Sequence, residues 1–400
     1  MPKFSHKTEQ LEFSPIRKLV DDAIDAKNRG LEVFHLNIGQ PDISAPDESL
    51  KKITNNTLTY LPYGQSEGTE EYRRTLCDYY QDHHIHLSPK DIIVTTGSSE
   101  ALIFCFNVIC NPKDQVIIPE PFYANYNGFA RSCDVDVIPI VSEFDSDFKL
   151  LPVQAFEEKV TDKTRAIVLC NPSNPTGYIC HRQEIIDLCE LAVKHDFFLI
   201  VDEVYREFIY DGSSHYSVLS SVKYAQHTIM IDSVSKRYSL CGARVGSIAS
   251  RNHEFLQQVL KFAQLRLSPP TLDMIISQAA IQSSKKYLMN AVDEYRIRKE
   301  VAVEFLSRIP NVRVVAPRGA FFCMAELPIK DAEDFSKFLL TSFSDNHQTV
   351  MLAPGNGFYS DDCYGKNQIR VAFVLEKTKL KRAIQIIEKG LESYIARLND

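Results

Sequence analysis

The sequence predicts an α/β fold in which a mostly parallel central sheet is flanked by helices, followed by a smaller α+β unit. Two observations support this prediction. Short apolar runs alternate with helical patterns between residues 91 and 249, and the alternation stops after Leu267-Ser268-Pro269-Pro270. Strands that alternate with helices indicate parallel strands joined by helical crossovers, which cover both faces of the sheet.

The central part of the chain contains the runs that we expect to form this sheet. The predicted strands span residues 91–96, 115–118, 135–140, 166–170, 197–202, 228–232 and 246–249. The predicted helices between them span 99–108, 125–131 and 183–195. Because ligands bind at the carboxyl ends of the strands in open parallel sheets, the loops after these strands are where we expect a functional site.

The C-terminal part of the chain follows a different pattern. It is predicted to be mostly helical over 273–308, with later strands and helices at 312–315, 321–325, 331–343, 368–373 and 378–398. We therefore predict a large domain over 46–290 and a small domain over 291–400, with an N-terminal segment (1–45) that packs with the small domain.

Composition excludes several classes of protein. Hydrophobic residues make up 44% and charged residues 24% of the 400 residues, which argues against disordered, collagen-like or coiled-coil chains. The formal net charge of −7 argues against a nucleic-acid partner. No apolar stretch predicts a membrane span or a secretory signal, and the ten cysteines form no Cys-x-x-Cys pair. We therefore expect a cytoplasmic protein with free thiols.

The loop Thr96-Gly97-Ser98-Ser99 lies between a predicted strand and a predicted helix. A helix N-terminus has unpaired N–H groups and a partial positive charge that suit a phosphate, and the two hydroxyls add donors. A simple helix cap is the commoner use of serine here. The chain has no G-x-G-x-x-G or G-x-x-x-x-G-K-[ST] pattern, which argues against nucleoside triphosphates and against a nicotinamide dehydrogenase.

Two further loops carry polar groups after predicted strands. Residues 171–177 (NPSNPTG) contain two prolines and so predict a stiff turn, from which Asn174 could present its amide. Asp202 and Glu203 follow an apolar strand, where a carboxylate either caps the next element or meets a cationic ligand atom. Tyr205 lies about one helical turn further and can point to the same side.

The fourth loop, Ser233-Val234-Ser235-Lys236, is followed by Arg244 eight residues after the lysine. A sheltered lysine can lose its proton and form a Schiff base with a carbonyl group. Serine hydroxyls and a planar guanidinium suit a phosphate. A single lysine is more often a solvated surface residue, so the functional interpretation rests on the ordered set of four loops.

Taken together, the four loops resemble those of class I/II aminotransferases, which are fold-type I enzymes dependent on pyridoxal 5′-phosphate. The likeness extends from Asn37-Ile38-Gly39-Gln40-Pro41 to residues 368–373 (QIRVAF), and it is nearest to the bacterial aspartate aminotransferases. The resemblance implies a homodimer with shared active sites. It also implies amino transfer from an L-amino acid, aspartate as first choice, to a 2-oxo acid, 2-oxoglutarate as first choice, by a ping-pong mechanism.

The resemblance implies a role for each matching residue. Lys236 would hold the cofactor as a Schiff base and move the substrate proton, Asp202 would pair with the pyridine nitrogen, and Tyr205 would bind the phenolic oxygen. The remaining cofactor contacts would be Ser98, Ser99, Ser233, Ser235 and Arg244 on the phosphate, Tyr123 on the ring face, Asn174, and Tyr63 from a partner subunit. The substrate α-carboxylate would meet Asn174 and Arg370 beside the Gly39 backbone.

Substrate specificity stays open at this point. One aspartate-specific branch has a lysine where this chain has Ser99, and another uses a partner-chain arginine before a Pro-Pro pair, for which Arg266 is the available analogue. Alanine, aromatic or broad-range transamination, and a lyase or synthase reaction on the same fold, are the alternatives. A transcription-regulator module would need an attached DNA-binding domain. Residues 83–86 (HHIH) are interpreted as a solvated loop, and no metal is expected.

Overall fold

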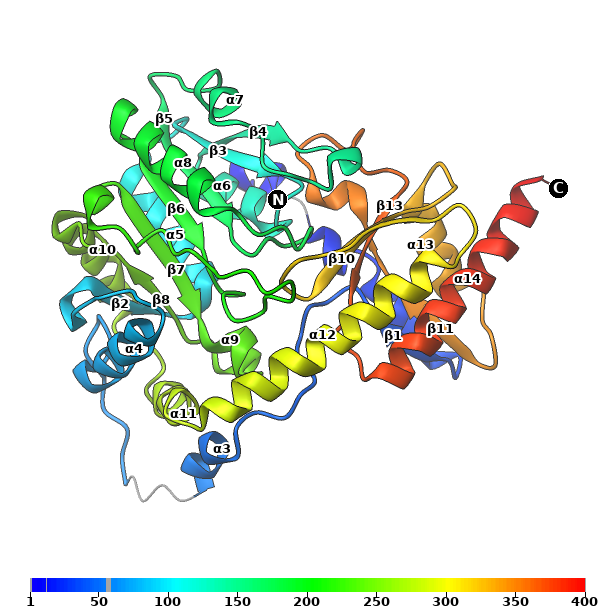
Figure 1. Cartoon of the computed structure of the whole chain (residues 1–400), viewed down its shortest axis with the longest axis horizontal. Helices are drawn as coiled ribbons and strands as arrows, with labels where there is room; N and C mark the ends of the chain where they lie inside the picture. The colour runs from blue at the N-terminus through cyan, green and yellow to red at the C-terminus, as the bar shows by residue number, and fades with distance from the viewer. Residues whose placement is uncertain (1, 12, 55–58, 400) are drawn as a thin grey trace.

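A seven-stranded sheet forms the core of the larger part of the molecule (Figure 1). The computed structural model describes residues 2–11, 13–54 and 59–399. In the described chain the strand order is β2-β8-β7-β6-β5-β3-β4. The strands are β2 (Ile92–Thr95), β3 (Gln115–Glu120), β4 (Asp136–Val141), β5 (Thr164–Cys170), β6 (Phe198–Asp202), β7 (Thr228–Ser233) and β8 (Gly246–Ala249).

The sheet is parallel except at one strand. Neighbours from β4 through β7 run parallel, whereas β8 is antiparallel to both β2 and β7. The connection from β7 to β8 contains α9 (Val234–Arg237), which is too short to carry the chain back along the length of a strand. The predicted α/β fold with a mostly parallel sheet is confirmed.

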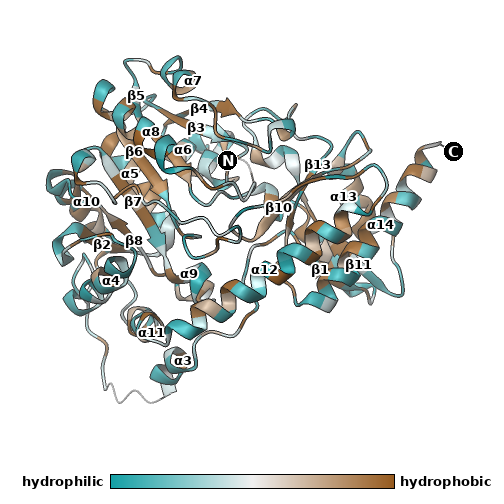
Figure 2. Cartoon of the chain, viewed as in Figure 1, coloured by the Kyte–Doolittle hydropathy of each residue, from teal (hydrophilic) through white to brown (hydrophobic). Residues whose placement is uncertain are grey.

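Helices cover both faces of this sheet because side chains of successive strand residues point to opposite faces. On β6, Leu199 and Val201 pack in one apolar cluster and Ile200 in another. The first cluster includes α4 (Glu70–Asp82), α8 (Arg182–His195) and α11 (Thr271–Ile281), and the second includes α5 (Gly97–Ile109), α6 (Asn125–Ser132) and α10 (His253–Arg266). Figure 2 shows the brown, apolar strands between these helices.

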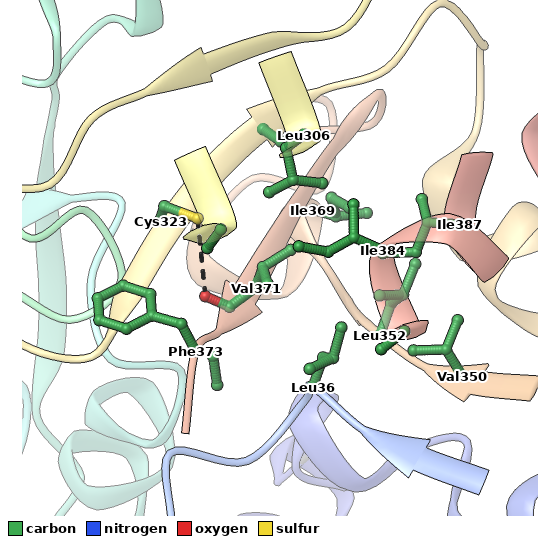
Figure 3. Packing of buried hydrophobic residues seen from close by; sticks show 14 of the residues in the cluster. Leu36, Leu306, Cys323, Val350, Leu352, Ile369, Val371, Phe373, Ile384 and Ile387 are labelled. Atoms are coloured by element: carbon green, nitrogen blue, oxygen red, sulfur yellow. Dashed lines mark hydrogen bonds between the residues drawn. The ribbon is translucent and has the colours of Figure 1, made fainter. Parts of the chain in front are cut away.

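A second sheet lies in the C-terminal part of the chain. It has the order β12-β13-β10-β9, with neighbouring strands antiparallel. Its strands are β9 (Arg313–Val315), β10 (Phe322–Glu326), β12 (Ala353–Pro354) and β13 (Gln368–Ala372). Figure 3 shows Ile369 and Val371 of β13 packed with Ile384 and Ile387. The latter two lie on α14 (Lys377–Asn399), so this helix covers the second sheet.

The N-terminal segment contacts the C-terminal part. Strand β1 (Glu32–His35) pairs in parallel with β11 (Gln348–Met351), and α2 (Val20–Asn28) packs on α13 (Ala332–Thr341). The other short helices are α1 (His6–Gln10), α3 (Asp47–Thr54) and α7 (Val153–Glu157). These contacts support our proposal that residues 1–45 pack with the small domain.

The helical stretch predicted over 273–308 is divided in the structure. Helix α11 ends at Ile281, and Ser284 caps α12 (Lys285–Ser307) by accepting a hydrogen bond from the Lys286 N–H. Helix α12 runs from α11 toward the C-terminal sheet (Figure 1), and our proposed domain limit at 290/291 falls within it. Among the described residues, no helix combines the length and the apolar character that crossing a bilayer requires.

Candidate functional site

A cavity of about 600 Å³ opens at the carboxyl ends of β5, β6 and β7. It is also bordered by the start of α5 and by segments from both ends of the chain. Every predicted site residue except Tyr63 lines this cavity, namely Gly39, Ser98, Ser99, Tyr123, Asn174, Asp202, Tyr205, Ser233, Ser235, Lys236, Arg244 and Arg370. Loops far apart in sequence therefore meet here, as expected for a parallel sheet.

One wall of the cavity is suited to an oxyanion. Ser98 and Ser99 lie in the first turn of α5, where backbone N–H groups are unpaired. The Ser98 Oγ atom is buried and has no hydrogen-bond partner in the structure. Gly97 has a φ of +76°, and a Cβ atom there would lie 2.3 Å from Nη2 of Arg244. The glycine thus lets the guanidinium approach the helix start closely.

Two more hydroxyls face this wall from the loop after β7. The Ser233 and Ser235 Oγ atoms lie 2.6 Å apart, and Ser233 also accepts a hydrogen bond from the Ser235 N–H. Arg244 donates through Nη1 to the Cys241 carbonyl oxygen at 3.1 Å, which orients its guanidinium. Hydroxyl, amide and guanidinium donors converge on one region, and this donor set is the one that binds phosphate in proteins.

Lys236 is the third residue of the short helix α9, whose N-terminus is capped by Ser233. Its Nζ atom donates to the Gly39 carbonyl oxygen at 2.9 Å and lies 5.9 Å from the centre of the Tyr205 ring. Burial lowers the pKa of the Lys236 ammonium, and the positive charge of Arg370 acts in the same direction. A lysine with a lowered pKa can act as a nucleophile or as a proton acceptor.

Asp202 is the last residue of β6, and its carboxylate is buried. It accepts hydrogen bonds from the Val204 N–H and the Tyr126 hydroxyl, each at 3.3 Å. Burial raises the pKa of Asp202 to about 7, because these two bonds do not offset the loss of water. A cationic ligand atom would stabilise the charged form of this carboxylate.

Arg370 of β13 is buried against two aromatic rings. Its Cζ atom lies 4.3 Å from the ring centre of Phe322 and 4.7 Å from that of Phe358. Nη1 donates to Oδ1 of Asn174 at 2.8 Å, Nη2 donates to the Asn37 carbonyl oxygen, and Nε has no partner. Burial lowers the pKa of this guanidinium to about 10, which still leaves it charged at neutral pH. A carboxylate ligand would satisfy it.

Three further residues complete the inner surface. A Cβ atom at Gly39 would lie 2.2 Å from the Phe322 ring, so only glycine fits beside that ring. The Tyr205 ring packs edge-on against Phe322, with ring centres 5.7 Å apart. The Tyr123 hydroxyl accepts a hydrogen bond from Asn125 Nδ2 at 2.8 Å. These contacts fix both tyrosine rings in the cavity wall.

Two residues considered from the sequence lie outside the cavity. The Tyr63 side chain is 83% exposed, so in this chain alone it contacts no part of the site. Arg266 donates to Glu100 Oε2 at 2.9 Å and to the Ser66 carbonyl oxygen at 2.8 Å. Because its guanidinium is occupied by its own chain, Arg266 is not available in this structure as a receptor for a ligand carboxylate.

Sequence reasoning missed one charged residue of the cavity. Arg17 lines it from the short 3-10 helix η1 (Pro15–Arg17) near the N-terminus. No motif surrounds this arginine, and only the folded chain brings it to the sheet. The charged side chains lining the cavity among the described residues are Arg17, Asp202, Lys236, Arg244 and Arg370. This excess of positive charge favours anionic ligands.

The chain is similar in sequence and in fold to several known proteins. A family model described as aminotransferase class I and II matches residues 32–387. The chain is 27% identical to the aspartate aminotransferase of Bacillus subtilis strain 168, covering 98% of this chain and 100% of that protein. It is 29% identical to the asparagine–oxo-acid transaminase of Streptococcus mutans serotype c, again covering 98% and 100%. The aspartate aminotransferase structure from Thermotoga maritima superposes with a TM-score of 0.88 at 24% identity, covering 97% and 100%.

Proposed function

Because the chain belongs to the class I and II aminotransferases, we propose that it moves an amino group from an L-amino acid to a 2-oxo acid by a ping-pong mechanism. Aspartate and 2-oxoglutarate are the first choice of substrates. The cofactor of this family, and of this chain, is pyridoxal 5′-phosphate. The observation that carries the proposal is the meeting of Lys236, Asp202 and Arg370 in one cavity with a phosphate-type wall.

The residues of the cavity fit this cofactor. A phosphate would give the buried Ser98 hydroxyl the partner that it lacks, and Arg244 would offset the negative charge. Asp202 would gain a counter-charge from a protonated pyridine nitrogen, which favours its ionised form over the neutral form that burial favours. When bound, the cofactor supplies an electron sink for the electrons released when the substrate Cα–H bond breaks.

The residues of the chain then have separate tasks. Arg370 and Asn174 hold the substrate α-carboxylate and so fix the direction of the Cα–H bond, which determines the bond that breaks. The Lys236 amine accepts the Cα proton, and its lowered pKa places a larger fraction in the neutral form at physiological pH. The Tyr205 hydroxyl adds a donor near the reacting centre.

We propose a homodimer in which Tyr63 reaches the phosphate of the partner subunit. Tyr63 lies among exposed apolar side chains, including Leu61, Leu265 and Leu267. The Ser66 hydroxyl donates to the Leu267 carbonyl oxygen at 2.6 Å, so these two segments lie side by side. An exposed apolar surface of this kind is typical of an interface between subunits.

The proposed chemistry can be tested by reducing the holoenzyme with borohydride and mapping the labelled peptide. We expect the cofactor to be fixed to Lys236, and label on another lysine would refute the assignment. Lys236→Ala should still bind the cofactor but lose turnover by about 10²–10⁴-fold, since it removes the proton acceptor. A panel of amino donors with 2-oxoglutarate and pyruvate, ranked by kcat/KM, separates aspartate from alanine, aromatic or broad-range activity. Failure to form any keto acid would favour a lyase or synthase.

Shared sites can be tested by mixing two inactive variants. Tyr63→Ala chains retain Lys236, and Lys236→Ala chains retain Tyr63. A mixed dimer would therefore contain one complete site, and we expect activity to return on mixing. If both variants are inactive alone and mixed dimers form but stay inactive, the sites are not shared through Tyr63.

A further inference from the structure

One cation of the cavity has no task in the proposed function. Arg244 is assigned to the phosphate, Arg370 to the α-carboxylate and Lys236 to proton transfer, which leaves Arg17. Within the described residues, no carboxylate pairs with the Arg17 guanidinium, whereas the neighbouring Lys18 pairs with Glu333. A cation that faces a ligand cavity without a protein counter-charge is available for an anionic group of the ligand.

The position of Arg17 is tied to that of Arg370 through one residue. Asn37 is fully buried and accepts a hydrogen bond from Arg370 Nη2 through its carbonyl oxygen. The Nδ2 atom of the same asparagine donates to the Ile16 carbonyl oxygen at 2.9 Å. Because Ile16 directly precedes Arg17, this bond anchors the backbone that carries Arg17 close to Arg370, while the Arg17 side chain is exposed at the cavity lining.

A second contact anchors the same segment through Ser14. The Ser14 hydroxyl donates to Asn125 Oδ1 at 3.2 Å, and Asn125 in turn donates to the Tyr123 hydroxyl. Burial raises the pKa of Tyr123, and the positive charges of Arg370 and Arg17 both oppose that rise. Both guanidinium groups therefore act on the same phenol from within one cavity.

We propose that Arg17 binds the distal carboxylate of a dicarboxylic substrate, while Arg370 binds its α-carboxylate. This assignment rests on the proposed function and names its substrate class as acidic amino acids and the corresponding 2-oxo diacids. A guanidinium can bind a carboxylate through two parallel hydrogen bonds, and a monocarboxylic substrate such as alanine has no second carboxylate to accept them. Arg17 thus determines specificity, and it takes the place that the sequence suggested for Arg266.

The test compares Arg17→Met, Arg17→Lys and the control Lys18→Met in the holoenzyme. For Arg17→Met we expect kcat/KM for aspartate to fall about 10- to 100-fold, the range for losing hydrogen bonds to a charged group, with alanine unchanged. Arg17→Lys should retain part of the preference, because it keeps the charge but loses the planar fork. Lys18→Met removes an adjacent cation that does not line the cavity, and it should leave both substrates unaffected.

A binding measurement separates this inference from the proposed function. Titration with succinate and with butyrate, followed by the cofactor absorption band, reports dicarboxylate and monocarboxylate affinity without turnover. We expect Arg17→Met to weaken succinate binding by a similar factor and to leave butyrate binding unchanged. Unchanged succinate binding, or an equal loss for aspartate and alanine, would overturn the role of Arg17. If the wild-type enzyme transaminates no amino acid, but Arg17→Met still weakens succinate binding, the proposed function would be overturned and the role of Arg17 would stand.

Discussion

Two buried aspartates at the ends of neighbouring strands have opposite electrostatic states. Asp202 ends β6 and Asp232 lies near the end of β7, and both side chains are buried. Burial raises the pKa of Asp202 to about 7, whereas the pKa of Asp232 is lowered to about 2. The same residue type, at the same edge of the same sheet, is thus about half protonated at neutral pH in one place and fully ionised in the other.

The difference lies in the partners of each carboxylate. Burial alone would raise the pKa of Asp232, but Arg237 and Arg206 outweigh that effect. Arg237 donates two hydrogen bonds to it, at 2.7 and 2.9 Å, and the Tyr80 hydroxyl donates a third at 2.8 Å. Asp202 receives only a backbone N–H and a hydroxyl. Asp232 therefore has its counter-charge built into the fold, whereas Asp202 requires one from a ligand.

The largest effect on stability is expected from Asp232→Asn. Arg206 would retain its ion pair with Glu203, but Arg237 would lose its carboxylate while remaining buried. Breaking one partner of a buried pair costs about 3–5 kcal/mol, so the free energy of unfolding in denaturant should fall by that order. Asp136→Asn is a matched control, because it breaks an exposed pair with Lys113 and should change stability little. If both variants lowered the free energy of unfolding by a similar small amount, Asp232 would not act as the buried counter-charge of Arg237.

The converse is expected at Asp202. Asp202→Asn should keep or raise the stability of the cofactor-free protein, since it removes a buried carboxylate that has no direct ion-pair partner among the described residues. It should lower kcat by about 10²–10³-fold, the cost of removing one group that stabilises charge in the transition state. Steady-state kinetics and denaturant unfolding on the same sample measure both effects. Unchanged kcat with normal cofactor binding would argue against pairing with the pyridine nitrogen.

The adjacent acidic residues Asp202 and Glu203 show how much of the site can be predicted from the sequence. Their place after an apolar run predicted carboxylates at a strand end, yet no local pattern separates their tasks. In the structure Glu203 turns away from the cavity and binds Arg206 and the Ser217 hydroxyl. The resemblance to a family, rather than local pattern, singled out Asp202. Side-chain partners that come from distant strands cannot be inferred from neighbours in sequence.

In other parts of the fold, too, local patterns predict the secondary structure but not the tertiary contacts. The apolar runs predicted the central strands within a few residues, because burial on both faces leaves a clear signal. The reversed direction of β8 and the break between α11 and α12 depend on short connections and on the cap at Ser284, which periodicity does not detect. Arg17 was missed because a residue near the N-terminus joins the site only through tertiary contacts such as that of Asn37 with Ile16.

The two aspartates also predict opposite responses of the cofactor-free protein to pH. Between pH 4 and 7 the unfolded chain loses the Asp202 proton while the folded chain keeps it, so wild-type stability should fall relative to Asp202→Asn as pH rises. Between pH 4 and 2 the folded chain keeps Asp232 ionised while the unfolded chain takes up a proton. The advantage of wild type over Asp232→Asn should therefore shrink as pH falls.

Each slope is limited to about 1.4 kcal/mol per pH unit for one proton. Unfolding free energies of wild type and both variants, measured from pH 2.5 to 8, test the two windows. Parallel curves of unfolding free energy against pH for wild type and Asp202→Asn between pH 4 and 7 would show that the pKa of Asp202 is not raised by folding. The two carboxylates would then not differ in the way described.

The smallest effect on function is expected at the cavity wall formed by the start of α5, where we place the phosphate. Like Asp202, this wall has a polar group without a full set of partners in the protein, namely the Ser98 hydroxyl. Ser98→Ala removes a buried hydroxyl without a protein partner, so stability should hardly change. Cofactor affinity should fall by about tenfold, the cost of one hydrogen bond to a charged group. Ser277→Ala on α11 removes an equally buried hydroxyl outside the cavity and should leave the affinity unchanged. Equal affinities for the two variants, measured by titration of the cofactor-free protein, would mean that Ser98 does not contact the phosphate.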